Sequence, residues 1–386
     1  MRCRAEGGRP QVGPERRSPY TGHGDIMTAK RIRVGIIGTG FARSTQVPAF
    51  QACPGVEVVS IASSRVERAE TVARDLGIPH GAGDWREVVD NPQVDLVSIV
   101  TPPHLHHAMA LAALQAGKAV LCEKPTSLDA AEAEIMWLAA EQRGTLALLD
   151  HELRFLPSRQ RMRELVQSGE LGTLYHARVY YRSDNRAGPE RAWDWWSDMS
   201  RGGGLLGAIG SHAVDSLRFV LGREPLEVMG MMSTHVTTRL DEHTRESRVV
   251  TSDDEIQALM GFGGELTAAV SLSSVEPGEP LHGMEVYGSK GGLRVVGETL
   301  WHSPVGSRQW APVALPAPES LPEGMPDNEW ARGFLHYARA LTGTLGSGAR
   351  ALPGAATFED GWRNMRVLDA VRRSHSERRW VSISNR

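Results

Sequence analysis

Short apolar runs alternate with helix-like segments over the chain from residue 30 to about residue 150. The apolar runs are 32–37, 56–62, 94–100, 119–122 and 145–149, and each is typical of a strand buried on both faces. Helix-like segments at 42–52, 65–75, 104–116 and 128–142 separate them. Strands that alternate with helices form a parallel sheet with right-handed crossovers. The pattern therefore predicts an α/β domain over residues 30–150.

The pattern changes after residue 150. Strands are predicted at 174–182, 227–238, 255–262, 265–274, 282–287 and 292–296, with few helices between them. This indicates a second domain, residues 151–386, of the α+β class with a large, mostly antiparallel sheet. Two helices at 327–343 and 357–374 and a short strand at 380–383 close the chain. We expect the Pro-rich segment 311–326 to cross between the domains and the C-terminal helices to pack back on the first one.

The segment before residue 30 has no such periodicity. Residues 1–29 are rich in Arg, Gly and Pro, so we expect a disordered N-terminal extension. No apolar stretch follows Arg16-Arg17, which argues against a secretory signal.

Composition narrows the range of partners. The chain has 386 residues, and its formal net charge of −3 gives no electrostatic case for nucleic acid or an anionic membrane surface. No apolar run approaches the roughly 20 residues of a membrane span. The three cysteines match neither a disulfide framework nor a metal-ligand spacing, so we expect a reducing, cytoplasmic environment and no metal.

A glycine-rich turn follows the first strand. Gly38 permits a tight turn, and Gly40 allows the backbone to approach a pyrophosphate held at a helix N-terminus. The predicted phosphate site is completed by Thr39, Phe41 and Ala42. Arg43 stands where the usual dinucleotide fingerprint has a third glycine or alanine.

The end of the second strand bears on the choice of cofactor. An enzyme that selects NAD usually has an acidic residue here, but this chain has Ser63, Ser64 and Arg65. Hydroxyls and an arginine suit a 2′-phosphate, so we predict NADP in preference to NAD. In the alternative interpretation Ser64 caps the next helix and Arg65 is solvated.

A lysine follows a later strand of the same sheet. Glu123, Lys124 and Pro125 come directly after the apolar run 119–121. Ligands of parallel sheets bind at the carboxyl ends of the strands, so Lys124 should face the same crevice as the glycine turn. Its ammonium can stabilise alkoxide charge on a reacting oxygen.

Taken together, these segments resemble the glucose–fructose oxidoreductase, inositol dehydrogenase and rhizopine-catabolism family (Gfo/Idh/MocA). The motifs are GTGFAR at 38–43, TPPHLH at 101–106, EKP at 123–125, RF at 154–155 and GGGLLGAIGSHAVD at 202–215. The resemblance covers about residues 31–384 and implies a Rossmann domain followed by an open-faced α+β domain. It implies an NAD(P)-dependent oxidoreductase that acts on a carbohydrate-like secondary alcohol or ketone.

The resemblance also implies roles for single residues. Thr101, Pro102 and His106 would pack against the nicotinamide ribose, and Lys124 would bridge the cofactor and the substrate hydroxyl. Glu123 would anchor the lysine or a ribose.

The last motif departs from the family at one position. His212 would be the general base, but Ala208 occupies the position of the aspartate that usually orients it. Asp215 is a candidate substitute.

Substrate contacts are expected from Trp195 and Arg154 in addition to Lys124 and His212. Two other functions stay open: an enzyme that retains its cofactor and uses transient oxidation for elimination or glycoside hydrolysis, and a catalytically impaired cofactor-binding protein. An open apolar sheet face indicates a homodimer or homotetramer.

Overall fold

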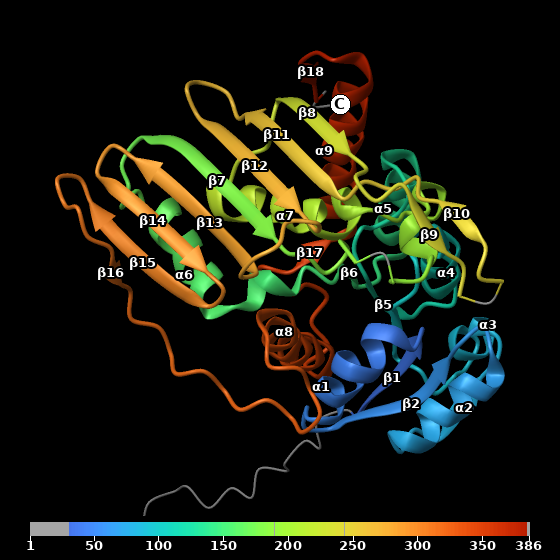
Figure 1. Ribbon diagram of the computed structural model, residues 1–386. Coiled ribbons are helices and arrows are strands. Elements are labelled where there is room, and N and C mark those ends of the chain that lie inside the picture. Colours follow the sequence, from blue (N-terminus) through green and yellow to red (C-terminus); the bar gives the residue numbers. More distant parts are fainter. Residues whose placement is uncertain (1–30, 189, 243, 384–386) are drawn as a thin grey trace, which may run out of the picture.

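A seven-stranded sheet forms one half of the computed structural model, which describes residues 31–188, 190–242 and 244–383 (Figure 1). Its strand order is β17-β6-β5-β4-β1-β2-β3, and only β17 runs antiparallel to its neighbour. The strands are β1 Ile32–Ile37, β2 Val56–Ala62, β3 His80–Ala82, β4 Leu96–Ile99, β5 Ala119–Cys122, β6 Ala147–Leu149 and β17 Ala356–Thr357. The expected extension at 1–29 lies outside the described residues.

Five helices belong to this sheet. They are α1 Val47–Gln51, α2 Val66–Asp75, α3 Trp85–Val89, α4 His106–Gln115 and α5 Ala130–Arg143. A π-helical turn at Ala42–Gln46 precedes α1. The Asp129 side chain caps α5 by accepting from the backbone N–H of Glu132, and Gly144 ends it in the left-handed conformation. The alternating Rossmann fold predicted from the apolar runs is confirmed.

Three elements of this half were not predicted: β3, α3 and the two-residue strand β17. The strand β3 has only three residues, His-Gly-Ala, and of these only Ala82 is buried. The helix α3 has only five residues, and a capping box between Asp84 and Glu87 stabilises its N-terminus. All three are too short to produce a hydrophobic period.

A nine-stranded sheet forms the other half, with the order β16-β15-β14-β13-β7-β12-β11-β8-β18. All neighbouring pairs are antiparallel except β7 and β12, so the sheet is mixed but mostly antiparallel, as predicted. The strands are β7 Leu174–Arg182, β8 Glu227–Ser233, β11 Glu255–Gly261, β12 Thr267–Ser273, β13 Leu281–Gly288, β14 Gly291–Val296, β15 Thr299–Pro304, β16 Ala311–Pro312 and β18 Val381–Ser382. A separate ribbon pairs β9 Thr238–Leu240 with β10 Ser247–Val249, where the sequence had indicated a continuation of β8.

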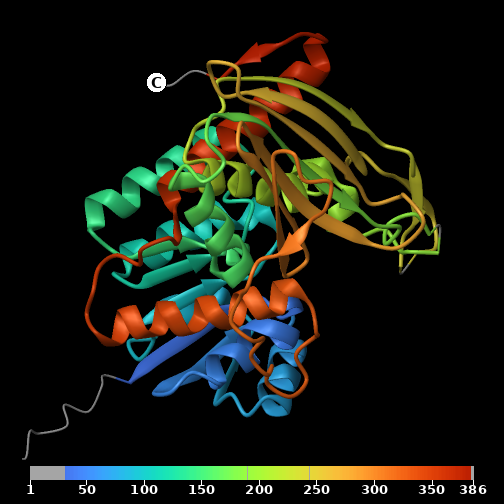
Figure 2. The same cartoon turned by 90° about the vertical axis from the view of Figure 1, so that its left-hand side faces the viewer.

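Helices cover one face of this large sheet and leave the other face open. The covering helices are α6 Pro157–Gln167, α7 Ser211–Leu221 and α9 Phe358–Glu377. Their apolar side chains form one core with the buried positions of β7, β11, β12 and β13. Figure 2 shows these helices between the large sheet and the Rossmann half. The helix α6 was not predicted, because its apolar positions are few among Arg, Gln and Glu.

The helix α8, Glu329–Gly346, lies on the Rossmann half although it comes late in the chain (Figure 1). Phe334 and Tyr337 are fully buried and share a core with β1 and α1. The chain reaches α8 from β16 through the Pro-rich segment. After α8, β17 adds to the edge of the Rossmann sheet. Within the part of the chain that the structure describes, no helix has the length and apolarity that a membrane crossing requires.

Candidate functional site

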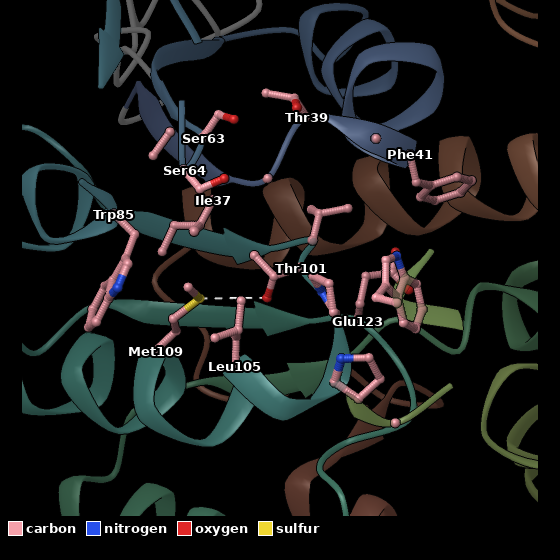
Figure 3. Close-up of a pocket in the computed structure, with 18 of the residues that line it drawn as sticks. Ile37, Thr39, Phe41, Ser63, Ser64, Trp85, Thr101, Leu105, Met109 and Glu123 are labelled. Carbon is pink, nitrogen blue, oxygen red and sulfur yellow. Dashed lines mark hydrogen bonds between the residues drawn. The ribbon is translucent and has the colours of Figure 1, made fainter. Parts of the chain in front are cut away.

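A cavity of about 1000 Å³ lies where the carboxyl ends of β1, β4 and β5 face the second half of the molecule. The Rossmann side supplies the glycine turn, the loop after β4 and the EKP segment, and the other side supplies Trp195, Trp196 and Ala208; Trp330, at the start of α8, also lines the cavity. In Figure 3, Ser63 and Ser64 lie on the same side of this pocket as Thr39, while Trp85 and Glu123 lie at opposite ends of it. This is the position at which parallel sheets bind their ligands.

The glycine turn has the geometry of a phosphate cradle. Gly38 has φ +112°, and a Cβ there would lie 2.1 Å from the carbonyl oxygen of Val100. Gly40 borders the pocket, and a Cβ there would meet nothing within 4 Å. Gly38 therefore serves the turn itself, whereas Gly40 leaves its backbone open to a ligand. Thr39 and Phe41 also line the pocket, but Ala42 is fully buried in the core.

The ribose end of the pocket differs in one residue from the prediction. Ser63 and Ser64 line the pocket, but the arginine beside them is Arg68. Arg65 lines a neighbouring hollow of about 430 Å³, which Arg68 and Arg43 also border. Arg43 pairs with Asp75 at 3.0 Å on the surface.

Sequence reasoning missed Arg68, although its place one turn after Arg65 on α2 was a usable signal. It also missed Trp85, which belongs to the unpredicted helix α3 and lines the pocket.

The loop after β4 brings Thr101 and Pro102 to the pocket but keeps His106 out of it. The His106 ring is buried, with Nδ1 2.9 Å from the Pro125 carbonyl and Nε2 2.8 Å from the Thr101 carbonyl. Burial lowers the pKa of His106 to about 4, so the ring is neutral and donates to one of these carbonyls. His106 thus joins the two loops that border the pocket and does not itself face a ligand.

Lys124 and Glu123 both line the pocket at the end of β5. The Lys124 Nζ donates to the Ala208 carbonyl at 3.0 Å, which connects it to the opposite wall. Glu123 accepts from Gln46 Nε2 at 3.1 Å. The same nitrogen donates to the buried Asp150 at 3.0 Å.

The carboxyl groups around Lys124 hold their protons more tightly than usual. Burial raises the pKa of Glu123, and the Lys124 ammonium only partly opposes this. Burial, together with Glu123 and Glu152, raises the pKa of Asp150 well above its ordinary value. The end of β5 therefore brings together carboxyl groups whose pKa values are raised, a feature typical of functional sites.

His212 lies behind the pocket wall. Its ring is 1% exposed and does not line the pocket, and Trp330, which does, lies 4.8 Å away between ring centroids. Neither ring nitrogen has a hydrogen-bond partner. Burial, then Lys124 and His151, lower the pKa of His212 well below its ordinary value, so the imidazole is neutral.

The structure does not bring the other two candidates of this region to His212 or to the pocket. Arg154 is buried, and its Nε and Nη2 donate to Asp215 at 2.9 and 2.6 Å, so the expectation that it binds substrate is not supported. Asp215 is held by Arg154 and does not replace the missing partner of His212. Trp195, by contrast, lines the pocket as expected, next to Trp196.

Among the described residues, no group of three or more His, Cys, Asp or Glu side chains could hold a metal ion.

Comparisons with known proteins agree with this architecture. A family model described as "Oxidoreductase family, NAD-binding Rossmann fold" matches residues 32–151, and one described as "GFO/IDH/MocA C-terminal domain" matches residues 159–294. Human glucose-fructose oxidoreductase domain-containing protein 2 is 31% identical over 91% of this chain and 93% of its own length.

Solved structures of similar proteins cover nearly the whole described chain. An oxidoreductase domain protein from Kribbella flavida superposes with a TM-score of 0.83 at 29% identity, covering 92% of this chain and 100% of that one. A levoglucosan dehydrogenase in complex with NADH and L-sorbose gives a TM-score of 0.83 at 25% identity, covering 92% of this chain and 99% of that one.

The two glycines of the turn should respond differently to a methyl group. Gly40→Ala should leave the melting temperature of the free protein unchanged, because its Cβ meets nothing. It should weaken cofactor binding about tenfold or more, the equivalent of one lost charge-assisted hydrogen bond. Gly38→Ala should instead destabilise the free protein by about 1–3 kcal/mol, because its backbone conformation is strained for alanine.

Calorimetry and cofactor titration of both variants check this contrast. Unchanged cofactor affinity in Gly40→Ala would show that no ligand backbone contact exists at this glycine.

Proposed function

The chain belongs to the Gfo/Idh/MocA oxidoreductase family and is an NAD(P)-dependent oxidoreductase, and we propose that its substrate is a carbohydrate-like secondary alcohol or the corresponding ketone. The observation that carries the proposal is the shared pocket of the glycine turn and Lys124. A nicotinamide cofactor, when bound, supplies or accepts the hydride. The protein must then hold the reacting oxygen and exchange its proton.

We propose that Lys124 holds the reacting oxygen. Its side chain lines the pocket at the strand end where the nicotinamide would lie, and its present acceptor is a neutral backbone carbonyl. A substrate oxygen that gains alkoxide charge is a better acceptor for an ammonium than a neutral carbonyl. The lysine therefore stabilises the transition state more than the bound ground state.

We propose His212 as a second candidate proton acceptor, on the condition that a substrate can reach its ring. Its two unpartnered nitrogens and its neutral form suit that role. The ring is buried and does not line the pocket, so a substrate would reach it only after the residues around it moved.

A sugar-like substrate is supported by the wall opposite the glycine turn. Trp195, Trp196 and Trp330 line it, and aromatic faces pack against the apolar face of a sugar ring. The similar levoglucosan dehydrogenase was solved with L-sorbose, a ketose, which supports the same substrate class.

For the cofactor we propose NADP(H) in preference to NAD(H). Ser63, Ser64 and Arg68 border the pocket at the end of β2, and Arg65 and Arg43 lie in the adjoining hollow. Arg68 and Arg65 at this corner favour a 2′-phosphate through charge-assisted hydrogen bonds, whereas Arg43 is paired with Asp75.

We also propose a homodimer or homotetramer joined through the open face of the large sheet. Met231 on β8 and Leu259 on β11 alternate with the buried positions of their strands, and each is more than half exposed there. Burying such a face removes apolar area from water. The buried free cysteines Cys53 and Cys122 suit a reducing compartment, for which we propose the cytoplasm.

Lys124→Met should lower turnover by about 10²–10³-fold while the cofactor dissociation constant changes little, because the lost interaction belongs to the transition state. Steady-state assays on a panel of sugars and polyols, with fluorescence titration of the cofactor, measure the two quantities. Lys290→Ala, at the exposed turn between β13 and β14, is the control and should match the wild type.

Full activity of Lys124→Met would remove the lysine from the chemistry. Substrate conversion by the wild type without net change in nicotinamide absorbance would indicate the retained-cofactor alternative. A wild type that binds cofactor but converts nothing on the panel would indicate the impaired binding protein.

Arg68→Ala and Arg65→Ala should each weaken NADP(H) about tenfold or more and leave NAD(H) nearly unchanged, because only NADP(H) carries the 2′-phosphate. Arg74→Ala, exposed in the last turn of the same helix, is the control. Equal losses for both cofactors in isothermal titrations would show that these arginines do not recognise the phosphate.

Leu259→Lys should shift the protein toward the monomer, because it places a charge within the proposed interface. Ile135→Lys, on the exposed face of α5, adds the same charge elsewhere and should not. Sedimentation of the wild type at the monomer mass of 42.1 kDa across the micromolar range would overturn the interface.

A further inference from the structure

We propose that Glu152 transfers the substrate proton next to Lys124, in the role left open by Ala208. This inference rests on the proposed oxidoreductase function. In alcohol oxidation the substrate O–H bond breaks and its proton joins a Glu152 carboxylate oxygen. The O–H electron pair forms the second C–O bond, and the C–H electron pair leaves with the hydride to the nicotinamide. Ketone reduction reverses each step, with the Glu152 carboxyl group as the proton donor.

Glu152 lies in the same pocket as Lys124. Glu152 opens the short 3₁₀ turn Glu152–Phe155, which follows β6 beyond the carboxyl end of the sheet. It lines the same pocket as Lys124 and Ala208 while only 3% of its surface is exposed. Its side chain therefore lies at the floor of the cavity, next to the proposed site of the reacting oxygen.

One side-chain oxygen of Glu152 forms no hydrogen bond within the protein. Glu152 Oε2 is buried and has no hydrogen-bond partner. A buried polar atom without a partner is costly in a protein that binds nothing there. Because Glu152 lines the pocket, rotation of its carboxyl group would bring this oxygen to a substrate hydroxyl there.

The aspartate that the family usually has near the proposed base is replaced here by Ala208, so another group must exchange the proton. Ala208 contributes only its methyl group to the pocket wall, and its carbonyl accepts from Lys124. Asp215 is paired with Arg154, and His212 is buried and does not line the pocket. Among the described residues that line the cavity near Lys124, the side chains able to exchange a proton are those of Glu123 and Glu152. Glu123 already accepts from Gln46.

The groups around Glu152 raise its pKa into a range in which the side chain can both donate and accept a proton. Burial, then the neighbouring Glu123, raise the pKa of Glu152 to about 8, against the opposing effect of Lys124. The titratable groups that act on it from the adjoining strand ends and from α8 are Glu123, Lys124, Asp150, Glu329 and Tyr337.

The direction of the pH dependence follows. Below pH 8 the carboxyl group is mainly protonated and donates to a ketone, and above pH 8 it is mainly ionised and accepts from an alcohol. Ketone reduction should therefore fall, and alcohol oxidation should rise, as the pH increases through about 8.

The test compares wild type, Glu152→Gln, Glu152→Asp and His212→Asn in both reaction directions over a range of pH, with the sugar panel and both cofactors. Glu152→Gln should lower kcat by about 10²–10⁴-fold and lose the inflection near pH 8, with little change in cofactor affinity. Glu152→Asp should keep a pH-dependent residual rate, because it retains a carboxyl group. His212→Asn should keep the inflection.

A second readout does not need turnover. Infrared difference spectra between pH 7 and pH 9 should show loss of a protonated-carboxyl band in the wild type that Glu152→Gln lacks.

Wild-type kcat in Glu152→Gln, or an inflection removed by His212→Asn instead, would overturn the role of Glu152 and leave the oxidoreductase function standing. An infrared difference unchanged by Glu152→Gln would overturn it as well. Absence of wild-type turnover with every substrate and cofactor would overturn both proposals together.

Discussion

The guanidinium group of Arg154 holds together the elements that surround the pocket floor. It donates to Asp215 of α7 at 2.6 and 2.9 Å and to Asp360 of α9 at 3.3 Å. Burial acts to raise the pKa of Asp360, but Arg154 and Arg218 outweigh it and hold that pKa at about 2. Removing one partner of such a buried pair leaves an unpaired charge and typically costs about 3–5 kcal/mol. The position of Glu152, two residues before Arg154, depends on this network.

The pocket floor concentrates carboxyl groups around one ammonium. Glu123, Asp150 and Glu152 all have raised pKa values, and burial is the main cause for each. One ammonium can neutralise only one carboxylate, so the charged forms of these neighbouring groups disfavour one another, and the pKa of Glu152 is raised to about 8. An enzyme of this family whose usual aspartate is missing thus still has acids that can exchange protons beside the proposed hydride site.

Sequence reasoning worked best where function depends on a short local pattern. The glycine turn, Ser63, Ser64, Thr101 and Lys124 all line the cavity, because each follows a strand whose carboxyl end must face it. Reasoning from single motifs failed for Arg154 and His106. Both side chains bond to other parts of the chain, and no motif shows which partner a buried polar group will find.

The sequence by itself determined the alternation of long strands and helices in the first half, the change to a mostly antiparallel sheet, and the placing of Lys124 at a strand end. Hydrophobic period and turn residues are local, so they can be read along the chain. Only the tertiary structure decided which side chains meet at the pocket. Trp330 comes from α8, which packs on the Rossmann half from near the end of the chain, and it lines the pocket and contacts His212. Glu152 reaches the pocket floor because buried ion pairs fix the turn after β6, and such long-range contacts leave no periodic signal in the sequence.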